Sequence, residues 1–213
     1  MTQATFAEYS LEMTTQSRPE YSDITTEDEL IKYTRTYAKQ AVDEYDYDVN
    51  LDFLNEITVS KQFKRSAAKF MGQKVPGASI HIPIDWEKAN DRFEPIDRFE
   101  DDLREFDLKL SWDAFKAWGE EMWQEAIRHE LIHVEQAQTF GTSDHRADFK
   151  ARARRRDAAV RCQQFTPYTY NFDCSECGET EYGRFQMCKE VEKIREGSFA
   201  SECCGSELVV REQ

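Results

Sequence analysis

Residues 112–141 read WDAFKAWGEEMWQEAIRHELIHVEQAQTFG, and the interpretation of the whole chain starts from this stretch. Apolar residues recur along it at helical spacing, which predicts a long amphipathic helix. Ser111 precedes the stretch as a capping residue, and Gly141 is a typical helix terminator. Gly119 marks a point where the helix can break.

Within this helix, residues 129–133 have the pattern His-Glu-x-x-His. Residues four apart lie on the same helical face, so the imidazoles of His129 and His133 can bind one metal ion. Glu130, one position further round, is placed to act as a catalytic base beside that ion. Such a pattern also arises by chance, but the helical context favours a zinc site.

A catalytic zinc ion needs a third protein ligand and an open fourth position. One common arrangement of the third zinc ligand requires a glycine at 136 and the ligand at 139. The chain has Gln136 and Thr139 there, so this arrangement is excluded. His145 follows His133 by twelve residues, beyond a turn that contains a glycine. We therefore expect His145 to be the third ligand, and we assign His81 no metal-binding role.

Other segments predict an α+β fold around this helix. Thr26 and Glu29 form a capping box for a helix over 27–46. A second helix is expected over 145–163. Three short runs of alternating apolar and polar residues predict a small three-stranded sheet: Ile57 to Val59, Ile80 to Ile84, and Phe106 to Leu110. The acidic segment from Asp85 to Asp107 is expected to be a solvated insertion with a charged helix.

The 213 residues carry a formal net charge of -14, which disfavours general attraction to nucleic acid. Solubility alone explains this charge, and a hypersaline cytoplasm is the more specific explanation. One segment, 146–161, differs because it has seven basic and two acidic residues. We expect phosphate contacts there from Arg152, Arg155 and Arg156.

Five of the six cysteines lie within the last forty residues, at Cys174, Cys177, Cys188, Cys203 and Cys204. The first two form a Cys-x-x-Cys-Gly pattern, which is typical of a zinc knuckle. The second knuckle is broken, since Ser201 occupies the position of its first cysteine. Adjacent residues seldom direct both side chains at one ion, so Cys188 and Cys204 are expected to complete a structural zinc site, with Cys203 as an alternative ligand. Buried free thiols are the other explanation.

Aromatic residues at Tyr168, Tyr170 and Tyr182 surround this knuckle. Rings in so small a unit serve first to fill its core. Any ring that remains exposed can stack on the bases of single-stranded DNA.

The quoted residues resemble the SprT-like family, which includes the Spartan proteases that digest proteins crosslinked to DNA. The resemblance rests on HELIH at 129–133, on DHRADFK at 144–150, and on LKLS at 108–111 before the helix. It implies a zincin-like metalloprotease core with His129, His133 and His145 as ligands, Glu130 as base, and a zinc-ribbon-like tail. Arg146 departs from the family pattern, which usually has glycine after the third histidine.

These observations predict a flexible arm over 1–25, a metalloprotease domain over 26–163 and a zinc-ribbon-like subdomain over 164–213. We expect one catalytic and one structural zinc ion, a protein or peptide substrate, and DNA, preferably single-stranded, as a partner. No segment has the apolar length of a membrane span, and none resembles a signal peptide, so a cytoplasmic protein without a membrane partner is expected. The alternative function is a non-catalytic, zinc-stabilised module that binds nucleic acid.

Overall fold

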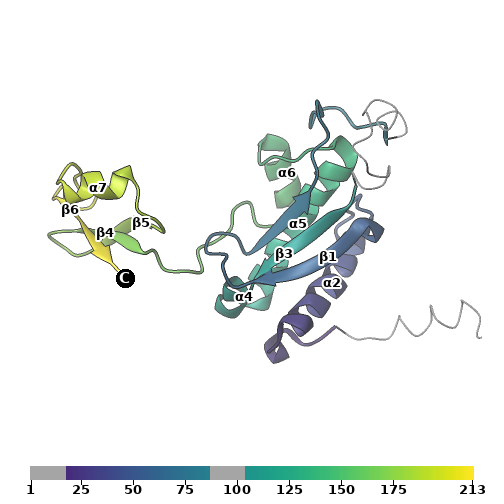
Figure 1. The fold of residues 1–213 in the computed structure, drawn as a ribbon, viewed down its shortest axis with the longest axis horizontal. Coiled ribbons are helices and arrows are strands. Elements are labelled where there is room, and N and C mark those ends of the chain that lie inside the picture. The colour runs from purple at the N-terminus through teal and green to yellow at the C-terminus, as the bar shows by residue number, and fades with distance from the viewer. Residues whose placement is uncertain (1–17, 87–103) are drawn as a thin grey trace, which may run out of the picture. The chain divides into compact units, whose positions relative to one another are not determined.

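The computed structural model describes residues 18–86 and 104–213, and it has the α+β architecture that the sequence predicts (Figure 1). The chain divides into two compact units, Met1–Cys162 and Gln163–Gln213. Every helix in the described ranges is too short or too polar to cross a membrane.

The first unit contains a three-stranded sheet built from β1 (Leu54–Ser60), β2 (Ala68–Gly72) and β3 (Phe106–Ser111). The strand order is β1-β3-β2, with β3 parallel to β1 and antiparallel to β2. Leu108 and Leu110 of the central strand are completely buried. Their alternation with polar residues is the signal that predicted β3.

The prediction of a strand over Ile80 to Ile84 is wrong. This segment is irregular, and Ile82 is exposed at its centre. Pro83 cannot donate to a strand ladder, and the backbone N–H of Ile84 instead donates to Thr139 at the end of a helix. The third strand is β2, whose sequence has no clear alternation.

Helix α2 (Glu27–Glu44) begins with the predicted capping box, in which Thr26 and Glu29 satisfy each other's backbone N–H groups. Its buried face packs against helix α5 (Glu120–Phe140), and both helices cover the sheet. Helix α2 lies nearer to β1, whereas α5 lies nearer to β2 (Figure 1).

The expected long helix is divided into α4 (Trp112–Ala117) and α5, with the break at Trp118 and Gly119. Ser111 caps α4 by accepting the backbone N–H of Ala114. Helix α5 ends at Gly141, which has a positive φ of 68°. This left-handed conformation favours glycine, as the sequence indicated.

Helix α6 (Ala147–Arg155) is shorter than the predicted 145–163. Asp157 adopts a positive φ of 45°, and the N–H of Ala158 bonds back to the carbonyl of Ala153. This is a Schellman-type termination, with aspartate in the position that glycine usually occupies. Phe149 and Ala153 form the buried side of α6.

Two further expectations fall partly outside the described residues. The expected arm at 1–25 is described only from Arg18 onward, and the hydroxyl of Tyr21 in a short 3-10 helix (Tyr21–Asp23) donates to Phe115. Most of the predicted insertion with its charged helix lies at 87–103, outside the described residues. A second 3-10 helix, Leu51–Phe53, precedes β1.

The second unit contains strands β4 (Tyr170–Cys174), β5 (Thr180–Arg184) and β6 (Leu208–Glu212), together with helix α7 (Lys189–Arg195). The strands form an antiparallel sheet in the order β5-β4-β6. Its core consists of four buried residues, Phe172, Val191, Ile194 and Leu208. An apolar core of this size stabilises a unit of about fifty residues only weakly without a further crosslink or metal ion.

The aromatic residues near the cysteines mainly complete this small core. Tyr170 and Tyr182 pack against it, and the ring of Tyr182 meets Phe172 edge-on at 4.8 Å between centroids. Tyr168 packs against Phe185 at 4.8 Å. The rings therefore have the core-filling role that the sequence favoured.

Candidate functional site

Three histidines converge at the junction of α5 and α6. His129 and His133 lie one turn apart on α5, and His145 comes from the connection that precedes α6. The Nε2 atom of His145 lies 3.1 Å from Nε2 of His129 and 3.0 Å from Nε2 of His133. The structure therefore brings together the three ligands that the sequence indicated.

The spacing of these nitrogen atoms fits a zinc ion. Four ligands at 2.0–2.1 Å in tetrahedral geometry are separated by about 3.3 Å from one another. The observed separations of 3.0 and 3.1 Å are close to that value, and three protein nitrogens would leave the fourth position of a tetrahedral ion for water or substrate. Three imidazoles with one open position are the donor set of a catalytic rather than a closed structural zinc site.

Burial keeps these imidazoles in the neutral form that binds a metal. It lowers the pKa of His129 to about 4 and that of His133 to about 3, and the neighbouring histidines add to both shifts. The pKa of the more exposed His145 is also lowered by burial. Nδ1 of His129 lies 2.6 Å from the carbonyl oxygen of Ala159, so a donating Nδ1–H leaves Nε2 free for the ion.

Phe149 forms the apolar floor of the site. This fully buried residue of α6 places its ring 4.7 Å, centroid to centroid, from each of the three imidazoles. Its packing excludes water from one side of the histidines and limits the rotation of their rings. Helix α6 begins between His145 and Phe149, which are four residues apart in the sequence.

Glu130 is buried next to the histidines and faces strand β2. Its Oε2 atom accepts a hydrogen bond of 2.6 Å from the backbone N–H of Phe70. Burial raises the pKa of Glu130 to about 7, although the Phe70 N–H and the charge of Lys69 oppose this shift. A carboxyl group with such a pKa can both accept and release a proton near neutrality.

Two of the three arginines predicted to contact phosphate are bound inside the protein instead. Arg152 and Arg156 donate to the carboxylate of Glu135 on α5, whose side chain is only 3% exposed. Arg155 is exposed on α6, as are Lys150 and Arg154. The prediction missed this arrangement because the carboxylate that pairs with both arginines lies seventeen or more residues away in sequence.

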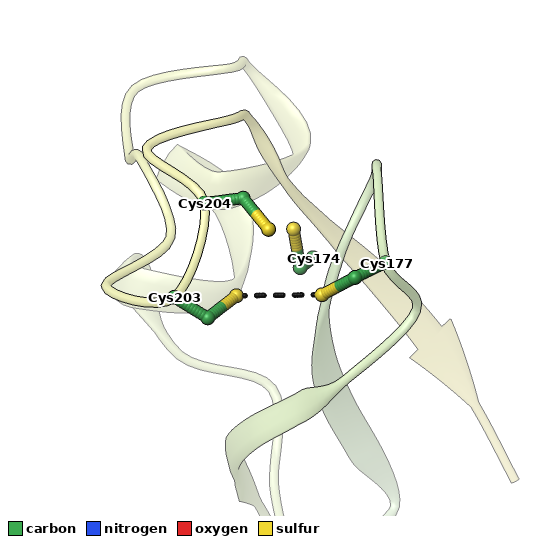
Figure 2. Close-up of side chains that lie close together, drawn as sticks. All are labelled: Cys174, Cys177, Cys203 and Cys204. Atoms are coloured by element: carbon green, nitrogen blue, oxygen red, sulfur yellow. Dashed lines mark hydrogen bonds between the residues drawn. The ribbon is translucent and has the colours of Figure 1, made fainter.

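Four cysteines of the second unit form another group that can hold a metal ion. The sulfur atoms of Cys174, Cys177, Cys203 and Cys204 all lie within 4.8 Å of one another. Figure 2 shows the four side chains directed toward one centre, two from the β4–β5 turn and two from the loop before β6. Four thiolates in a closed set are typical of structural zinc.

The group contains Cys203, which the sequence left as the alternative ligand, and not the expected Cys188. Cys188 is the N-cap residue of α7 and packs against the apolar core, whereas Cys203 supplies the fourth sulfur atom. The turn from Ser201 to Gly205 allows two adjacent cysteines to face one centre. The N–H of Gly205, at a positive φ of 69°, closes that turn onto the carbonyl of Ser201.

Ser201, which occupies the position expected for a ribbon cysteine, supports the group without being part of it. Its buried hydroxyl lies 3.3 Å from the sulfur atom of Cys174. The backbone N–H of Cys177 and this hydroxyl lower the pKa of Cys174 to about 6. Thiolate, rather than thiol, is the form that binds zinc.

No family model, curated protein or solved structure matches the chain in comparisons with known proteins. The two groups of metal-binding residues and the buried Glu130 are therefore the basis for assigning a function.

Proposed function

We propose that this chain is a zinc-dependent metallopeptidase of the SprT-like type, with His129, His133 and His145 as zinc ligands. The main support for the proposal is the placement of Glu130. Glu130 directly follows the ligand His129 on α5, and its carboxylate is buried against β2 with a pKa raised to about 7. A purely structural zinc site has no need for a carboxylate at this position.

A zinc ion held by the three histidines would polarise a peptide carbonyl and acidify a water molecule. Glu130, whose Oε2 accepts the hydrogen bond from Phe70, would take a proton from that water on its other oxygen, Oε1, as the water oxygen adds to the peptide carbonyl carbon and before the C–N bond breaks. The same carboxyl group then gives the proton to the departing amine. Phe149 and the walls of the site exclude bulk water from the buried side of the histidines.

Strand β2 offers a route for an extended polypeptide to reach this centre. It is an edge strand of its sheet, and the N–H of Phe70 points away from β3 toward Glu130. A substrate segment pairing with this edge beside Phe70, whose N–H stays bonded to Glu130, would have its backbone carried past the catalytic carboxylate. Peptide backbone, rather than a particular side chain, is thus the feature that we propose the site to recognise.

We also propose DNA as a partner, through a set of exposed cations that differs from the three arginines named from the sequence and shares only Arg155 with them. Exposed cations on and beside α6 support this proposal, at Arg146, Lys150, Arg154, Arg155 and Arg161. They belong to a chain of net charge -14, and three of them, Lys150, Arg154 and Arg155, lie on the helix that borders the histidine group. A protein attached to DNA is the corresponding substrate class.

The alternative function is a non-catalytic module that binds nucleic acid, in which both zinc ions only stabilise the fold. Glu130 distinguishes the two. We expect Glu130→Gln to lower the cleavage of an unfolded protein substrate by about 100-fold or more, while the zinc content stays at two ions per chain. Glu121→Gln, an exposed change on the same helix, serves as the matched control.

Equal cleavage by wild type and Glu130→Gln would exclude the proposed base. Wild-type protein that holds both zinc ions and cleaves no unfolded protein, with or without DNA, would instead favour the non-catalytic alternative.

A further inference from the structure

A buried network of charges joins the two helices that border the histidine group. Glu135 of α5 accepts two hydrogen bonds from Arg156, of 2.6 Å at Oε2 and 2.8 Å at Oε1. Arg152 donates a third, of 2.5 Å, to Oε2. Both arginines belong to α6 or its C-cap, and the side chains of Arg152 and Arg156 are 20% and 14% exposed.

The same network includes the segment that follows α2. The N–H of Asp48 donates to Oε1 of Glu135 at 3.0 Å, and Arg156 donates to the carbonyl of Asp46 at 2.8 Å. The guanidinium of Arg156 also lies 4.1 Å from the centre of the Tyr47 ring. Each carboxylate oxygen of Glu135 therefore accepts two hydrogen bonds, and Arg156 connects three different parts of the chain.

Stability alone does not account for charges in this position. A buried ion pair is often no more stabilising than apolar residues of similar volume, because the charges lose their hydration. What a planar, two-pronged arginine does provide is a fixed direction, since its N–H groups match a carboxylate in only a few orientations. The network consequently fixes the position of α6 along α5 more closely than apolar packing would.

The position of α6 along α5 affects the metal site, because the histidine group is divided between α5 and the connection that leads into α6. Glu135 follows His133 by two residues, and α6 begins two residues after His145. A displacement of α6 by about one ångström would move His145 away from Nε2 atoms that now lie 3.0 and 3.1 Å from its own. It would also move Phe149 relative to all three rings.

We propose that Glu135, Arg152 and Arg156 are positioning residues of the histidine site, which act on the metal through His145. The proposal rests on the metal site of the proposed function, but not on its peptidase activity. It also gives Arg152 and Arg156, the two part-buried arginines of the basic segment 146–161, a role in positioning His145, and leaves the exposed cations of that segment for DNA.

The test is a double-mutant cycle for zinc affinity with Glu135→Gln and His145→Ala in the full-length chain. The chain has only four histidines, so imidazole NMR signals follow zinc at this site separately from zinc at the thiolates. We expect Glu135→Gln alone to weaken zinc binding by about 10- to 100-fold, the usual effect of losing a residue that supports a ligand. In the His145→Ala background it should change the affinity by less than about twofold.

Two further variants keep the test decisive if Glu135→Gln fails to fold, which near-UV circular dichroism of buried Trp123 will reveal. Arg156→Lys retains the positive charge without the two-pronged geometry, and it should show the same dependence on His145. Arg155→Lys, on the exposed surface of α6, is its matched control and should bind zinc like wild type. Unchanged zinc affinity in folded variants, or an equal reduction with and without His145, would overturn the proposal.

Discussion

The backbone N–H of Phe70 lies 2.6 Å from Oε2 of Glu130 and joins the edge strand β2 to the helix that carries His129 and His133. This bond stabilises the ionised carboxylate, whereas burial disfavours it. The pKa of about 7 reflects burial, which raises it, against this bond and the charge of Lys69, which lower it. The edge strand thus contributes a main-chain group to the chemistry of the candidate base.

Replacing Phe70 by proline should shift the pH dependence of cleavage to higher pH. Proline has no N–H, so the charged form of Glu130 loses its hydrogen bond and its pKa rises. The base works only when ionised, and the acidic limb of the activity profile must therefore move upward. The measurement is cleavage rate against pH, with Phe70→Ala as the control that keeps the N–H. The same limb in both variants would show that the bond has no effect on the base.

His145→Ala should remove one zinc ion and leave the other. The two groups of ligands belong to different compact units, so disruption of one should not empty the other. Elemental analysis after dialysis against a mild chelator should give one zinc per chain, compared with two in wild type. Two retained zinc ions would reject His145 as a ligand.

The histidine group could be predicted from sequence because local rules determine most of it. Helical periodicity places His129 and His133 on one face, and Gly141 ends the helix so that the chain can reverse before His145. The capping box at Thr26 and the alternation in β3 are equally local. Each of these features depends on interactions within a few residues of sequence.

The features that sequence did not predict depend on interactions between distant segments. Strand β2 has one ordinary buried position, Ala68, and is recognisable only by its pairing with β3. Glu135 and Arg156 are 21 residues apart, and nothing in their spacing indicates a pair. Cys203, expected only as an alternative ligand, joins the cysteine group because a turn at Gly205 directs two neighbouring side chains to one centre.

The cysteine group should respond differently to serine at positions 203 and 188. Cys203→Ser removes a sulfur ligand and should weaken zinc binding in the second unit, whereas Cys188→Ser only changes a residue that packs on the core. The measurement is the thiolate-to-cobalt absorption of the cobalt-substituted protein. Its loss is followed as a chelator competes for the cobalt ion. If Cys188→Ser also abolishes that absorption, the ligand set given by the structure is incorrect.

Removal of the first cysteine pair should unfold the second unit alone. With four buried apolar residues as its core, this unit depends on the bound metal for much of its stability. The double variant Cys174→Ser and Cys177→Ser should therefore be cut rapidly by trypsin within the second unit, first after Arg184 and Lys189, while the first unit and its zinc remain. A tail that resists trypsin as well as wild type does would contradict a structural role for this metal.

DNA binding should depend on the exposed basic residues of α6. Removing one phosphate-binding cation should reduce the slope of log affinity against log salt by about 0.7 for single strands and about 0.9 for duplex. Arg154→Gln with Arg155→Gln removes two exposed cations without touching Glu135, so we expect a decrease of about 1.4 for single strands. At molar salt the Debye length falls to about 3 Å, and wild type and variant should then bind alike.

The matched control for this experiment is Lys32→Gln with Lys39→Gln, which removes the same charge from exposed positions on α2. General electrostatic attraction would make the two double variants equally weak, because each changes the net charge by the same amount. A local DNA surface on α6 would weaken only the arginine variant. Equal slopes in wild type and both variants would exclude α6 as a DNA-binding surface, and would leave the proposed peptidase centre without a nucleic-acid partner on that helix.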